Sequence, residues 1–151
     1  MTSALPLSWR LRATAAAIVI PPLLRMTSLA RLTAWLGAPR RPPRRPLQGP
    51  RSQNGLDDAS LARWVDRVLG RLPDPWHRTC LRRAAVLYHL LRKAGRPVEL
   101  CIGVRRNAGG PLAAHAWLVR DGEPYLEAEP HAAAIHTVIA RFPEPHNVLA
   151  S

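Results

Sequence analysis

Cys80 and His115 are the two residues whose types and surroundings best suit nucleophilic chemistry. Cys80 follows Thr79, a good helix N-cap, at the start of an apolar-periodic stretch, so it should open a helix. The unpaired N–H groups and the positive dipole end of a helix start favour the thiolate, which is the nucleophilic form of cysteine. Three arginines nearby add positive charge: Arg78, Arg82 and Arg83.

His115 can act as the base for such a thiol. It lies in the run Ala-His-Ala-Trp, where His115, Trp117 and Val119 share one face of a strand. Its ring can meet the helix of Cys80, accept the thiol proton and later protonate the leaving amine of a cleaved amide. A lone cysteine or histidine is more often structural, and Cys101, in the middle of a predicted strand, fits that role better than Cys80.

A carboxylate should orient the histidine, as in other catalytic triads. Asp121 lies at a predicted hairpin turn, and Glu123 lies just past it. Glu127 and Glu129 share one face of the following strand, which runs back alongside the strand of His115, so their side chains can approach it. Glu127 is therefore the first choice. A solvated charge on an edge strand is the alternative for each glutamate.

Two helices precede these strands. Asp57 or Asp58 can start the first helix, and Thr79 can cap the second, which ends near Gly95. The apolar residues of the first helix recur on one face at helical spacing: Leu61, Trp64, Val65, Val68 and Leu69.

The period changes to two after residue 97, which predicts strands over residues 97–105, 112–120 and 124–129. Asp121-Gly122 is a strong signal for a hairpin between the last two of these strands. Helices followed by strands predict an α+β domain with a mainly antiparallel sheet.

The N-terminal part of the chain has a different composition. Residues 1–38 are predicted to be a basic, partly helical region, residues 39–55 a Pro/Arg-rich linker, and residues 56–151 the domain that carries Cys80, His115 and Glu127. The apolar run 13–24 is interrupted by two prolines and is interpreted as a packing or interfacial helix rather than a secretory signal. Residues 23–36 have the pattern of a basic amphipathic helix, suited to domain packing or to a membrane surface. A ligand for an aromatic groove is the alternative for the proline-rich linker.

The net charge and the spacing of the cysteines and histidines limit the classes of function expected for this chain. The net charge is +12, and residues 1–56 hold nine Arg and no Asp or Glu, so this region can bind nucleic acid, anionic lipid or an acidic peptide, or be a solvated face. No module for reading nucleic acid is recognisable. No CxxC or HxxxH spacing occurs among Cys80, Cys101, His115, His131, His136 and His146, so neither a metal nor a cofactor is expected.

The order of these motifs resembles a known family. CLRRAAVLYHLLRKAGRPVELCIGV followed by AHAWLVRDGEPYLEAEP resembles the transglutaminase-like peptidases of lasso-peptide biosynthesis, in their stand-alone leader-peptidase form, over about residues 56–130. The resemblance implies a papain-like fold with Cys80 as nucleophile and His115 as base. The third position, usually aspartate, falls on Glu127, which is one methylene longer. The Cys80 backbone N–H is a natural oxyanion donor.

The resemblance also implies partners and a location. The substrate would be the leader of a ribosomally made precursor peptide, cleaved in the cytoplasm with a separate leader-recognition protein, and a macrolactam-forming cyclase would be a further partner. No nucleic acid is expected, and peripheral membrane contact stays open. The alternatives are a transglutaminase-like acyltransferase, a non-catalytic peptide-binding module, or a basic protein associated with nucleic acid or membranes.

Overall fold

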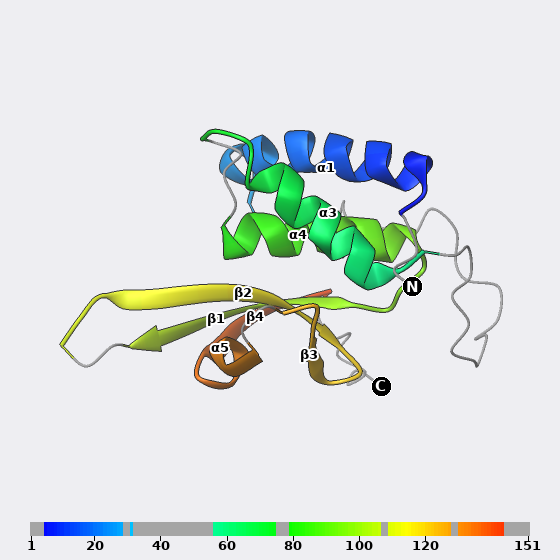
Figure 1. The fold of residues 1–151 in the computed structure, drawn as a ribbon. Helices are drawn as coiled ribbons and strands as arrows, with labels where there is room; N and C mark the ends of the chain where they lie inside the picture. The colour runs from blue at the N-terminus through cyan, green and yellow to red at the C-terminus, as the bar shows by residue number, and fades with distance from the viewer. Residues whose placement is uncertain are drawn as a thin grey trace, which may run out of the picture.

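Helices cover one face of a four-stranded antiparallel sheet in this computed structural model (Figure 1). The structure describes residues 5–28, 31, 56–74, 79–106, 109–127 and 130–143. Helix α4 lies on the sheet, and α1 and α3 pack against α4 and against each other. The helix bounds are α1 Leu7–Met26, α3 Asp58–Leu69, α4 Cys80–Lys93 and α5 Pro130–Ala134. The strand bounds are β1 Glu99–Arg106, β2 Leu112–Arg120, β3 Glu123–Tyr125 and β4 Thr137–Phe142. The α+β prediction is confirmed.

Polar caps begin α3 and α4 where the sequence predicts them. The Asp57 carboxylate accepts a hydrogen bond from the Ser60 N–H at 2.9 Å, and the Thr79 hydroxyl accepts one from the Arg82 N–H at 3.3 Å. The pKa of Asp57 is lowered, mainly by a hydrogen bond from the Ser60 hydroxyl. The hydrogen bond from the Ser60 N–H contributes to the same shift. Gly95, with φ of +78°, ends the turn after α4 in a conformation that glycine adopts readily.

Helix α1 differs from its prediction. It runs without a break through Pro21 and Pro22 to Met26, and Thr27 then has an extended backbone (φ −128°, ψ 153°). The basic amphipathic helix predicted over residues 23–36 is therefore wrong at its start, because residues 23–26 form the last turn of α1 and Thr27 is the C-cap of α1. Apart from Arg31, the remainder of the predicted helix beyond residue 28 lies outside the described residues.

The hydrophobic core joins α1 to the later elements. The buried residues of α1 belong to the same cluster as those of α3, α4 and the helix-facing side of the sheet. The α1 members of the cluster are Trp9, Ala13, Ala16, Ala17 and Ile20. The linker predicted for residues 39–55 lies outside the described residues. None of the helices in the described ranges is long and apolar enough to cross a membrane.

The strands follow the prediction up to residue 125. The sheet order is β3-β2-β1-β4, and Asp121 and Gly122 both have positive φ, as expected for a tight hairpin turn. The third strand was predicted to reach residue 129, which is wrong, because β3 ends at Tyr125. Leu126 has φ of +55°, which no strand accommodates, so the chain turns there.

Helix α5 and strand β4 were not predicted from the sequence. Helix α5 lies on the side of the sheet opposite α4, and β4 pairs with the outer edge of β1 (Figure 1). This pairing makes β1 a central strand. It also brings His136, directly before β4, toward the middle of the sheet.

Candidate active site

Cys80 is the first residue of α4, as predicted. Its side chain is partly buried against the main core, and the N-cap hydrogen bond of Thr79 fixes the first turn around it. The thiol therefore lies beside the unpaired N–H groups of the first turn of α4. The chain segment leading to Thr79, which includes Arg78, lies outside the described residues.

The two arginines after Cys80 make ion pairs with acidic side chains. Arg83 binds Asp66 of α3 through two hydrogen bonds, of 2.7 and 3.2 Å, and Arg82 lies 3.5 Å from Asp74. These contacts join α4 to α3 and to the turn that follows it. They also offset the positive charge that the sequence predicted beside the thiol.

His115 lies on β2 and is held between aromatic rings. The Trp117 ring stacks on it at 5.7 Å between centroids, and the His136 ring lies 5.4 Å away at a tilt of 35°. Directly across the sheet is Gly103, where a Cβ would lie 2.8 Å from the Trp117 ring and 2.9 Å from the His136 Cβ. A glycine is therefore required at 103 for these rings to pack.

Glu127 reaches His115 from the loop after β3. Its Oε2 lies 3.4 Å from His115 Nε2, and the two side chains are only 10% and 17% exposed. Nε2 is buried and has no hydrogen bond of good geometry within the described part of the chain. The Glu127 carboxylate is the acidic group beside it. The structure thus brings these two predicted residues together, although the turn at Leu126 and not a strand places the glutamate.

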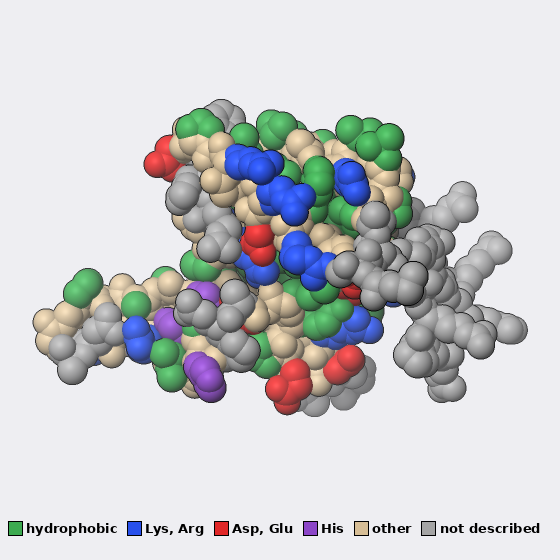
Figure 2. All heavy atoms as spheres, viewed as in Figure 1, with side chains coloured by type: hydrophobic (Ala, Val, Ile, Leu, Met, Phe, Trp, Pro, Cys, Tyr) green, Lys and Arg blue, Asp and Glu red, His purple; other side chains and the backbone are tan. Residues whose placement is uncertain are grey.

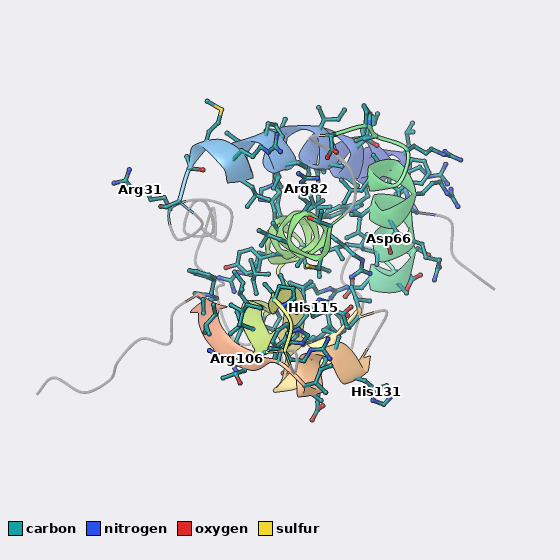
Figure 3. The ribbon with its side chains drawn as sticks, turned by 90° about the vertical axis from the view of Figure 1, so that its left-hand side faces the viewer. Arg31, Asp66, Arg82, Arg106, His115 and His131 are labelled. Atoms are coloured by element: carbon teal, nitrogen blue, oxygen red, sulfur yellow. The ribbon has the colours of Figure 1, made fainter. Side chains whose placement is uncertain are left out.

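Cys80 and His115 come from opposite sides of β2. Ala116 and Leu118 face the helices, whereas His115 and Trp117 face the side where Cys101 packs. Figure 3 looks along α4 with its first turn toward the viewer and places His115 below that end, between α4 and α5. His115 Nε2 makes no hydrogen bond to the Cys80 thiol in the described part of the chain.

A polar network fixes the chain just before Glu127. The Tyr125 hydroxyl donates to Asp58 at 2.7 Å and accepts from Arg120 at 3.1 Å, while Arg96 donates to Asp58 at 3.3 Å. Burial, together with the hydrogen bond to Asp58, raises the pKa of Tyr125. The network ties β3 to the first residue of α3. It therefore fixes the start of the turn that presents Glu127.

The other candidates from the sequence lie elsewhere. Cys101 is fully buried and its pKa is raised by burial, which suits a structural role. Asp121 and Glu123 are exposed at the hairpin, and His131 is exposed on α5. Glu129 and His146 lie outside the described residues. His136 was missed as a neighbour of His115, because nothing in the sequence signals that β4 returns beside β1.

No group of three His, Cys, Asp or Glu side chains in the described ranges is arranged to hold a metal ion. The chemistry available at this site comes from a thiol, an imidazole and a carboxylate. Together they are the residue types of a thiol nucleophile, its base and an orienting group.

The α+β fold, the cysteine at a helix start and the His–Glu pair beside the sheet define a class of proteins that carry the residue types of a thiol nucleophile, its base and an orienting group. A match to a family model over residues 5–140 identifies the family: the chain belongs to the transglutaminase-like superfamily, which includes cysteine peptidases and acyltransferases. The match includes α1. No curated protein and no solved structure matches the chain.

Proposed function

We propose that this protein is a cysteine peptidase that removes the leader from a ribosomally synthesised lasso-peptide precursor. The observation that carries the proposal is the Glu127 carboxylate 3.4 Å from the buried Nε2 of His115, below the helix that begins with Cys80. A carboxylate at Nε2 favours a proton on that nitrogen and leaves Nδ1 as the nitrogen that can accept one.

The proposed reaction has two halves. The Cys80 thiolate attacks the carbonyl carbon of the last leader residue, the C–N bond breaks, and the His115 imidazolium gives its proton to the leaving amine of the core peptide. Water then attacks the thioester with His115 as base, which releases the leader carboxylate and restores the thiol. The Cys80 N–H is the proposed donor to the oxyanion in both halves.

The leader substrate is supported by the resemblance of residues 56–130 to stand-alone leader peptidases, within a chain that belongs to the transglutaminase-like superfamily. The proposed partners are the precursor peptide, a separate leader-recognition protein and a macrolactam-forming cyclase, in the cytoplasm. Nucleic acid has no role in the proposal.

The test is cleavage of a purified precursor peptide in the presence of its recognition protein, followed by mass spectrometry. Cys80→Ala and His115→Ala should abolish release of the core peptide, whereas Cys101→Ala should retain it. Release of the core peptide by Cys80→Ala would overturn the proposal.

An acyltransferase would use the same thioester but deliver it to an amine. Added primary amine should therefore leave the free leader carboxylate as the main product if the enzyme is a peptidase. A leader amide as the main product would show that transfer, and not hydrolysis, is the activity.

A further inference from the structure

Helix α1 is apolar on the side that faces the core and also on the side that faces away from it. Its inner face is buried among α3 and α4, as the core positions of Ala13, Ala17 and Ile20 show. The sequence from residue 13 to residue 24 contains no charged side chain on any face of the helix. A helical segment without charge on any face is normally enclosed on all sides, yet α1 is the outermost element of the helical layer (Figure 1).

The outer face carries large exposed apolar side chains along its whole length. Leu7 is 70% exposed, Leu11 65%, Ile18 45%, Val19 50% and Met26 81%. At 100° per residue these five positions fall within one sector of about 120° of the helix, so they form a continuous stripe. Single exposed apolar residues are ordinary on a soluble protein, but a stripe of this length marks a surface that contacts something apolar.

Positive charge borders this stripe. At 100° per residue Arg12 and Arg25 lie at the two edges of the same sector and both are exposed, and residues 1–56 contain no acidic residue at all. Figure 2 shows hydrophobic side chains along the edge of the molecule formed by α1, with Lys and Arg side chains beside them. A symmetric pair of copies would place these basic faces against one another, which like-charge repulsion opposes.

We propose that the outer face of α1 docks on an anionic lipid bilayer. The helix would lie in the plane of the interface, with its five apolar side chains in the region between headgroups and acyl chains and its arginines on the anionic headgroups. The inner face would keep its place in the core, so docking requires no unfolding. The sheet, with β2 that carries His115, lies on the far side of α4 from α1 and would face the aqueous phase (Figure 1).

The test is flotation of the full-length protein with vesicles of phosphatidylcholine alone or mixed with phosphatidylglycerol. We expect binding to the mixed vesicles that weakens as salt is raised, and little binding to the uncharged ones. Leu11→Glu/Ile18→Glu should reduce the partition onto mixed vesicles by more than about tenfold, because two apolar side chains leave the interface. Ile139→Glu is the matched control, since Ile139 is also exposed (62%) but lies on β4, and it should bind as the wild type does.

Circular dichroism of each variant shows whether it is folded, and only folded variants enter the comparison. Cys80→Ala should bind vesicles normally, so failure of the peptidase proposal and failure of this one can be told apart. The proposal is overturned if the wild type ignores mixed vesicles or if Leu11→Glu/Ile18→Glu binds them unchanged. It is also overturned if the lipid-free protein is a dimer that the same double substitution separates, because the stripe would then be covered by a second copy.

Discussion

At the scale of single residues, the pair formed by His115 and Glu127 is the most constrained part of the site. The imidazole is stacked on Trp117, tilted against His136 and faces a carboxylate through Nε2. A ring held in this way loses rotational freedom before any substrate binds. In the proposed reaction, this fixes which nitrogen is held beside the carboxylate and which is left to accept a proton.

Glu127 is a positioning residue in this mechanism, because it acts through His115. Glu127→Ala and Glu127→Gln should lower kcat for precursor cleavage by about 10²- to 10⁴-fold with little change in KM, as expected when an orienting carboxylate is lost. Steady-state kinetics with purified precursor peptide measure kcat and KM separately.

Glu127→Asp is the control, because it keeps the charge and has the residue usual in the resembled family. It should retain much more activity than Glu127→Gln. Equal activity of the wild type and Glu127→Ala would show that the carboxylate has no role in the reaction.

The two cysteines should differ in reactivity. Cys101 is fully buried and burial raises its pKa, so at neutral pH its thiolate is scarcer than that of an ordinary thiol and rises only as the solution becomes more alkaline. Iodoacetamide at neutral pH should therefore alkylate Cys80 and leave Cys101 unmodified until the protein unfolds. Peptide mass spectrometry after timed labelling measures this, and faster labelling of Cys101 in the folded protein would contradict it.

At the scale of elements, the sequence was informative wherever structure depends on local pattern. The spacing of Leu61, Val65 and Leu69 and the caps Asp57 and Thr79 predict α3 and α4 correctly, because these signals act within one or two turns. Strands β1 and β2 followed from the alternation of apolar residues. The positive φ of Leu126 could not be foreseen, since a branched aliphatic residue is a poor candidate for that conformation.

Non-local contacts explain the rest of what was missed. Strand β4 pairs with β1 between residues that are 33 (Val104 and Thr137) to 42 (Leu100 and Phe142) positions apart in the chain, and that pairing brings His136 to His115. Glu127 was selected as a member of a strand, and it meets His115 from a loop instead. The choice of residue therefore rested partly on an element that ends two residues earlier.

The Tyr125 network should position this loop. Tyr125→Phe removes the hydroxyl that joins Asp58 to Arg120, so the unfolding free energy should fall by about 1 to 2 kcal/mol. The rate of precursor cleavage should fall several-fold as well, because β3 no longer anchors the turn before Glu127. Urea denaturation and steady-state kinetics measure the two effects.

Tyr88→Phe is the control, since it removes a phenol hydroxyl from α4, outside this network. It should leave the cleavage rate close to that of the wild type. A Tyr125→Phe enzyme that is destabilised but cleaves at the wild-type rate would show that the network stabilises the fold without positioning Glu127.

At the scale of the whole molecule, α1 determines how far the domain extends. Its inner face completes the core above α3 and α4, and the match to the superfamily begins at residue 5. Its outer face is the surface proposed to meet lipid. One helix thus has two apolar faces. Substitutions of adjacent residues in α1 can separate the contribution that each face makes to the free energy of unfolding.

Ile20 and Val19 are such a pair, because they are consecutive in α1 but 2% and 50% exposed, respectively. Ile20→Ala opens a cavity in the core that α1 shares with α3 and α4, so the unfolding free energy should fall by about 2 to 5 kcal/mol. Val19→Ala removes a side chain from the outer stripe and should change stability by less than about 1 kcal/mol. Urea denaturation monitored by tryptophan fluorescence measures both. Equal, small effects would mean that residues 5–26 do not belong to the cooperative unit that contains α4 and the sheet.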